Sequence, residues 1–282
     1  MFDIEYWGNH QFDTHSKTLH FNRGAGLCSN LGILIHLIAH LKAEKNFVPE
    51  RIVTRFAKYK DCNIYDNLFY IDKLEKWKNY STDNVKNMLS RATPSWVGWG
   101  NCKEDIDMET TNVIRDVYLN CSNLIAVETE KIYNDYHMDR DNFNFLLWRL
   151  TDKTQDIPVH DYPELDDALQ CFKTLDNVFV HTDDNHVYNM LKGKQMNMLD
   201  VLPRDPDRTG GHHYVNNLSE NEYENLFGHS YPVHMARILA LLNVASKSNT
   251  FVGYPGNMSF YICLLRQNFH NVHVFKRKNC MY

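Results

Sequence analysis

The feature that most constrains the fold is a regular alternation of two kinds of segment that begins at Asn144. Short apolar runs rich in Val, Leu and Phe have the length of strands, and the segments between them have the length of helices. We expect strands at residues 145–150, 178–181, 250–253 and 272–275, and helices at residues 164–174, 185–191, 231–246 and 259–268. Strands that alternate with helices in this way predict a parallel sheet covered by helices.

The first half of the chain carries a weaker version of the same pattern. An expected strand at residues 18–21 leads through a glycine-containing turn into a helix over residues 31–45, and further strands are expected at 52–56 and 68–71. The polar stretch at residues 138–142 separates this half from the regular one. The sequence therefore predicts an α/β protein with two Rossmann-like domains, each with a parallel sheet, over residues 1–140 and 141–282.

Composition excludes several classes of protein. The 282 residues carry a formal net charge of −5, which gives no overall basic field for a nucleic acid. The longest apolar run, residues 31–41, is too short to span a bilayer, and the N-terminus lacks the pattern of a signal peptide. The seven cysteines form no CxxC pair. We therefore expect a cytoplasmic protein with reduced thiols, no membrane segment and no nucleic-acid partner.

Charged residues follow abruptly on the apolar run that starts at residue 145. A buried parallel strand delivers the side chains at its carboxyl end to a crevice, which is where α/β proteins bind ligands. Arg149 and Lys153 suit a diphosphate, and Asp156 suits the role of a general base. The alternative is an ordinary strand end with solvated charges.

Two further turns have the character of anion sites. Gly24 and Gly26 precede one expected helix, and Gly256 and Asn257 precede another. Glycine lets the backbone approach a ligand closely, and a helix start offers unpaired N–H groups to an anion. The alternatives are a tight turn in the first case and a well-capped structural helix in the second.

These segments together resemble the α1,6-fucosyltransferase family, including the bacterial nodulation fucosyltransferases, which have the GT-B fold. The resemblance rests on the order and spacing of short motifs rather than on one long match. The motifs are NRGAGLCSNL at 22–31, LWRLTDK at 147–153, FVHTDD at 179–184, GHH at 211–213, and the helix and strand at 237–246 and 249–253.

The resemblance implies a role for individual residues. Arg149 matches the arginine that grips the donor phosphate, Lys153 matches a lysine near the reaction centre, and Asp156 matches the catalytic glutamate. The other donor-binding residues it implies are Gly24, Gly26, Leu27, Cys28, Asp183, Arg237, Asn249, Gly256, Asn257, Met258 and Ser259. His160 matches a histidine on the acceptor side, and Trp96 and Trp99 offer stacking surfaces for an acceptor sugar unless they pack in a core.

The implied activity is that of an inverting, metal-independent glycosyltransferase that moves a sugar from a nucleotide-sugar to a hydroxyl of an oligosaccharide or glycan. No cofactor is expected. Leu147 and Asn249 replace a histidine and an aspartate that the family places at the guanine base. An amide pairs with uracil donor to acceptor, which favours a UDP-sugar such as UDP-xylose, while a GDP-fucose-dependent enzyme is the alternative. The absence of an anchor favours a bacterial or virus-encoded enzyme.

Other classes of function stay open. One is a catalytically dead module that binds a glycan or nucleotide, because Asp156 is shorter than the glutamate it replaces. Another is a structural protein that assembles through residues 45–140. A metal-dependent transferase is a subsidiary option, since Asp105-Ile106-Asp107 forms a DxD motif and Asp183 and Asp184 are adjacent.

Overall fold

The structure is a computed structural model that describes residues 4–7, 10–23, 27–56, 122–149, 164–194, 196–202, 204, 219–254, 256–266 and 270–275. The chain divides into two compact units. The first holds Met1–Pro94 and Asp105–Leu124, and the second holds Ser95–Glu104 and Ile125–Tyr282. The division therefore comes earlier in the chain than the polar stretch at 138–142 indicated.

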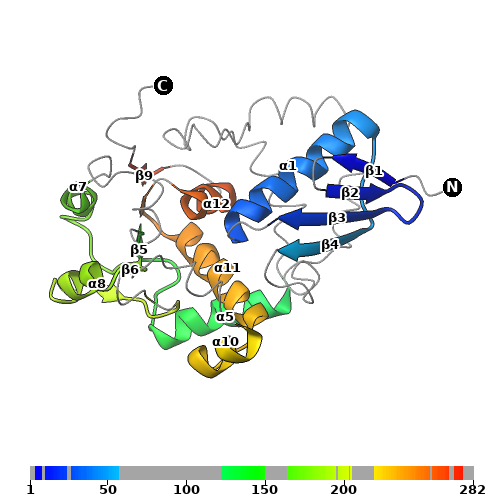
Figure 1. Cartoon of the computed structure of the whole chain (residues 1–282). Coiled ribbons are helices and arrows are strands. Elements are labelled where there is room, and N and C mark those ends of the chain that lie inside the picture. Colours follow the sequence, from blue (N-terminus) through cyan, green and yellow to red (C-terminus); the bar gives the residue numbers. More distant parts are fainter. Residues whose placement is uncertain are drawn as a thin grey trace. The chain divides into compact units, whose positions relative to one another are not determined.

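The first unit contains a four-stranded sheet in the order β1-β2-β3-β4 (Figure 1). Its elements are β1 (Ile4–Trp7), β2 (His10–Asp13), β3 (Thr18–Arg23), α1 (Leu27–Lys45) and β4 (Arg51–Phe56). β3 pairs with β4 in parallel across α1, as the expected strand-helix-strand pattern requires. β1, β2 and β3 pair in antiparallel fashion, so the sheet is mixed and the prediction of a purely parallel sheet was wrong here.

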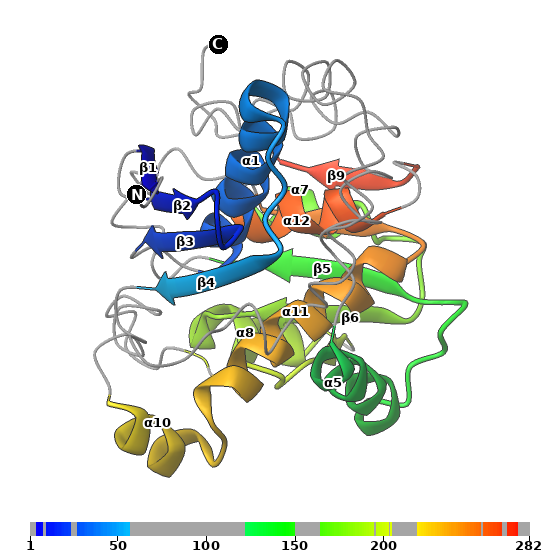
Figure 2. The same cartoon turned by 90° about the vertical axis from the view of Figure 1, so that its right-hand side faces the viewer.

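The second unit contains a five-stranded sheet whose pairs are all parallel, in the order β7-β6-β5-β8-β9. Figure 2 labels β5, β6 and β9 of this sheet. The strands are β5 (Asn144–Trp148), β6 (Val178–Thr182), β7 (Asn197–Met198), β8 (Phe251–Gly253) and β9 (Val272–Val274). The helices are α5 (Asn123–Asp135), α7 (Leu165–Gln170), α8 (Asn185–Lys192), α10 (Glu220–Phe227), α11 (Tyr231–Lys247) and α12 (Asn257–Leu265). The predicted parallel α/β architecture is confirmed for this unit.

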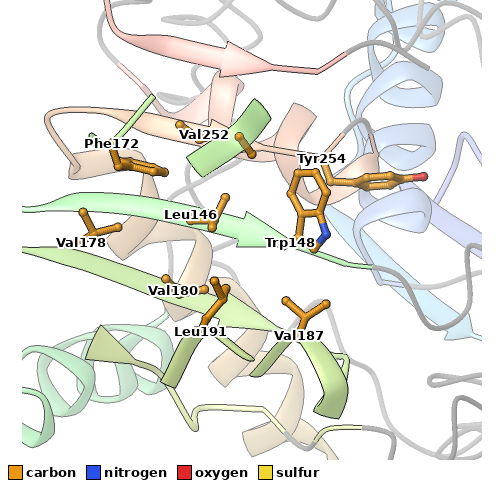
Figure 3. Packing of buried hydrophobic residues seen from close by; sticks show 10 residues of the cluster. Leu146, Trp148, Phe172, Val178, Val180, Val187, Leu191, Val252 and Tyr254 are labelled. Atoms are coloured by element: carbon orange, nitrogen blue, oxygen red, sulfur yellow. The ribbon is translucent and has the colours of Figure 1, made fainter. Parts of the chain in front are cut away.

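The central strands are buried on both faces, which explains their continuous apolar runs. All five residues of β5 and all five of β6 are buried. One face of the sheet packs against α8 and the segment after α7, in a cluster that includes Leu146, Trp148, Val180 and Val252 (Figure 3). Trp148 meets Tyr254 edge to face, with ring centroids 6.2 Å apart. α11 contacts β5, the central strand of this sheet (Figure 2).

At the amino ends of the strands, a buried arginine joins three segments of the second unit. Arg266 is 4% exposed and donates to the carbonyls of Ser246, Ser248, Asn249 and His270 at 2.9–3.5 Å. Burial lowers the pKa of its guanidinium. These bonds satisfy carbonyls at the end of α11 and in the turn before β8.

Among the helices that the structure describes, none combines the length and apolar character needed to cross a membrane.

Candidate functional site

Three strands of the second unit bring contacting side chains to one edge of the sheet. Arg149 follows β5, Asp183 follows β6, and Met258 lies in the first turn of α12, after β8. β5 lies between β6 and β8, so the residues that follow these parallel strands meet at the carboxyl edge. This is the edge at which open α/β sheets bind their ligands.

The Arg149 guanidinium makes a partly buried ion pair at this edge. Its Nε donates to Asp183 Oδ2 at 3.0 Å, and its Nη1 lies 3.3 Å from the sulfur of Met258. The Arg149 and Asp183 side chains are each 14% exposed. At this exposure water screens the charges only partly, so the ion pair holds the guanidinium in place.

The turn between β8 and α12 brings the start of α12 onto the end of the sheet. A Cβ atom on Gly253 would stand 2.7 Å from Ser259 Oγ and 2.6 Å from Phe251 Cζ, so a larger residue fits there only if these side chains shift. Ser259 is buried, and its hydroxyl donates to the Tyr254 carbonyl at 2.5 Å. Tyr254 N in turn donates to the Leu147 carbonyl, which extends the pairing of β8 with β5.

The backbone N–H groups in the first turn of a helix have no carbonyl partner within that helix. Those at the start of α12 therefore suit an anion. Gly256 is the N-cap residue and has an extended backbone, and Met258 is 5% exposed. The Ser259 hydroxyl already donates to Tyr254, so the group of Ser259 that suits an anion is its backbone N–H. The side chain of Asn257 lies outside the described residues.

The two adjacent aspartates after β6 have different contacts. Asp184 is fully buried and caps α8, since its Oδ1 accepts from His186 N at 2.7 Å and Val187 N at 3.0 Å. Asp183 faces Arg149 instead. Within the described ranges, no group of three or more His, Cys, Asp or Glu side chains is placed to hold a metal ion.

His181 lies on β6 behind this ion pair and was not anticipated from the sequence. It is 2% exposed, and burial lowers the pKa of its ring from the ordinary 6.5 to about 4. The Asp183 carboxylate opposes this shift and the Arg149 guanidinium reinforces it. The ring is therefore neutral at neutral pH.

Arg237, an expected donor-binding residue, is used to join two helices. Its Nε donates to Glu128 Oε2 at 3.0 Å, and its Nη1 lies 3.2 Å from His229 Nδ1. The Arg237 and Glu128 side chains are 22% and 12% exposed. These contacts link α11 to α5 and give Arg237 a structural role.

The structure places Asn249 at the opposite edge of the sheet. Its backbone N donates to the Phe143 carbonyl, and its side chain donates to Asp141 O at 3.5 Å and Asn142 Oδ1 at 3.4 Å. It lines a cavity of about 480 Å³ at the amino edge. Five residues of β5 separate this edge from Arg149, a distance of about 16 Å.

The structure therefore gives no support to the expectation that Asn249 reads the base of a nucleotide held by Arg149. Asn249 precedes β8, and a residue before a parallel strand lies at the amino edge, whereas Arg149 follows β5. Leu147, the other residue invoked for the base, is 1% exposed within β5. The argument for uracil over guanine loses its support.

The remaining expected residues divide into two groups. Leu27 and Cys28 open α1 in the first unit, where Leu27 is buried and the Cys28 thiol is half-buried. The others lie outside the described residues: Gly24, Gly26, Trp96, Trp99, Lys153, Asp156, His160, and the DxD motif at Asp105 and Asp107.

Comparison with known proteins gives matches of structure only. No protein-family model and no curated protein sequence matches this chain. Among solved structures, the chain is similar to NodZ α-1,6-fucosyltransferase soaked with GDP-fucose, at 13% identity and a TM-score of 0.47 over 88% of this chain and 92% of that one. It is also similar to the fucosyltransferase NodZ from Bradyrhizobium, at 13% identity and a TM-score of 0.48 over 90% and 95%.

Proposed function

We propose that this protein is a glycosyltransferase that binds a nucleotide-sugar at the carboxyl edge of its five-stranded sheet. The observation that carries the proposal is the position of Arg149, which follows the central strand β5 and is held there by Asp183 and Met258. An arginine fixed at this edge suits the diphosphate of a nucleotide-sugar, and the N-terminus of α12 suits the same negative charge. The motif at residues 147–153 supports the proposal independently of the geometry.

The proposed reaction is the transfer of a sugar to a hydroxyl of an oligosaccharide or glycan with inversion at the anomeric carbon. The acceptor oxygen forms a bond to the anomeric carbon as the bond from that carbon to the donor phosphate oxygen breaks. Asp156 is the proposed base that takes the acceptor proton, and Arg149 and Lys153 stabilise the departing diphosphate. His160, Trp96 and Trp99 are the proposed acceptor contacts.

For the donor we favour a GDP-sugar, with GDP-fucose as the first to test. The sequence argument for a UDP-sugar such as UDP-xylose depended on Asn249, which lies at the amino edge of the sheet. The motifs that resemble fucosyltransferases then support a GDP-sugar. We propose that the reaction needs no metal ion, so that transfer persists in the presence of EDTA.

The test is to compare Arg149→Met with Arg140→Met. Arg140 is a matched control because it also pairs with an acid, Glu130, but lies at the amino edge of the same unit. Loss of one preorganised charge at a transition state typically costs about 3–4 kcal/mol, so Arg149→Met should lower the transfer rate by roughly 10²–10³. Arg140→Met should leave it unchanged.

Binding separates the role of Arg149 from a general loss of structure. Calorimetric titration should show that Arg149→Met weakens GDP binding by about tenfold or more while guanosine binding changes little. Arg149→Lys, which keeps the charge, should lose less. Equal GDP affinities of Arg149→Met, Arg140→Met and the unchanged protein would refute the proposed site, and binding without any turnover would instead favour a catalytically dead module.

A further inference from the structure

Two arginines of the second unit are attached to the same short turn. Asp183 Oδ2 accepts from Arg149 Nε at 3.0 Å, and two residues later Asn185 Oδ1 accepts from Arg204 Nε at 3.1 Å. Two residues of chain span at most about 7 Å. Asp183 in the turn after β6 and Asn185 at the start of α8 therefore anchor two guanidinium groups at the carboxyl edge of the sheet, from backbone positions within about 7 Å of each other.

Arg204 is fixed more firmly than a surface arginine. Its guanidinium carbon lies 3.6 Å from the centre of the Tyr188 ring, and its Nη1 pairs with the Asp200 carboxylate. Asp200 is itself held, because Tyr188 Oη donates to its Oδ2 at 3.0 Å and its backbone N donates to Tyr136 Oη at 2.6 Å. The Arg204 side chain is 21% exposed. A guanidinium held in this way loses little further freedom when it binds an anion.

The buried ring of His181 supports the closeness of the two arginines. Burial is the main cause of its lowered pKa, and both the Arg149 and the Arg204 guanidinium lower that pKa further. Both cations therefore lie within electrostatic range of one ring. Since the ring is neutral at neutral pH, it adds no third positive charge.

We propose that Arg149 and Arg204 act as a pair that binds the two phosphates of the donor diphosphate. This inference rests on the proposed function, because it assigns a second ligand to the same nucleotide-sugar. Arg204 comes after β7, which lies beside β6, so the two arginines reach the turn from opposite sides of β6. A guanidinium has five N–H donors, and the hydrogen bonds of Arg204 to Asn185 and Asp200 use two of them. The pair should bind a diphosphate more tightly than a monophosphate, because a diphosphate contacts both arginines and a monophosphate contacts only one.

The experiment measures binding of GDP, GMP, UDP and UMP by calorimetry to the unchanged protein, Arg204→Met and Arg140→Met. Arg140 is again a close control: it stacks over the ring of Tyr133 at 4.7 Å and pairs with Glu130, as Arg204 stacks over Tyr188 and pairs with Asp200. Loss of one charged hydrogen-bonding partner should weaken the diphosphate by about tenfold to a hundredfold. The monophosphate should weaken by less than about threefold, and Arg140→Met should match the unchanged protein.

The outcomes separate the inference from the proposed function. If the unchanged protein binds neither diphosphate, the proposed function and the arginine pair both fall. If it binds a diphosphate and Arg204→Met binds it as well as Arg140→Met does, only the pair is refuted. An equal loss of diphosphate and monophosphate in Arg204→Met also refutes the pair, because it indicates a structural role. Should Arg204→Met not fold, Arg204→Lys replaces it, and an unchanged ratio of diphosphate to monophosphate affinity would then refute the pair.

Discussion

Mild acid should destabilise the second unit through a single buried residue, His181. The folded state holds its imidazole with a pKa of about 4, against an ordinary value of 6.5. Between these two values the unfolded chain binds a proton at this residue and the folded chain does not. The stability that neutral His181 contributes is therefore fully present above pH 6.5 and is lost as the pH falls through 4.

The size of the effect follows from the two pKa values. One unit corresponds to about 1.4 kcal/mol, so the full loss below pH 4 is about 3 kcal/mol. At pH 5 the unfolded chain is almost fully protonated at this position and the folded chain is not, which gives a loss of about 2 kcal/mol. This is a large part of the stability of an ordinary domain.

The assay is urea unfolding followed by circular dichroism at pH 7.5 and pH 5.0, for the unchanged protein and for His181→Gln. The carboxylates and the other histidines titrate in both proteins, so their contributions cancel in the comparison. The unchanged protein should lose about 2 kcal/mol more between the two pH values than His181→Gln. An equal loss in both proteins would show that the ring of His181 is not held neutral by burial.

Two further substitutions test the packing of α12 on β8 and the position of Asn249. Gly253→Ala should cost about 1–3 kcal/mol by urea unfolding, because its Cβ would overlap Ser259 and Phe251, whereas Gly193→Ala, whose Cβ meets nothing closer than 3.8 Å, should be nearly neutral. If the two variants are equally stable, α12 does not pack on β8 as described. Asn249→Asp should leave the preference between GDP and UDP unchanged in calorimetric titrations, and a shift toward GDP would return Asn249 to the donor site.

The sequence predicts the second unit well because its central strands are apolar on both faces. β5, β6, β8 and β9 each coincide with an expected strand, and α11 and α12 with expected helices. β7 was missed because it has two residues, Asn197 and Met198, and no apolar run. The antiparallel strands β1 and β2 were missed because each has four residues of mixed polarity.

The candidate site was predictable only where it depended on strand order. Arg149 and Asp183 both directly follow buried strands, so a parallel sheet brings them to one edge. Arg204 carries no such signal, because its place depends on how the chain returns from β7 to the turn at Asn185. Asn249 was assigned to the donor site from the family resemblance, although it precedes the expected strand at 250–253 and therefore belongs to the opposite edge of a parallel sheet.

The buried guanidinium of Arg266 couples three segments of the second unit during local unfolding. Its guanidinium bonds carbonyls at the end of α11, in the turn before β8 and before β9, so none of these segments separates without breaking bonds to the others. In the same region Asn249 N, Thr250 N and Phe251 N donate to Phe143, Asn144 and Asn271. These three amides should therefore share one free energy of opening in hydrogen exchange, as a single cooperative unit rather than as a fraying loop.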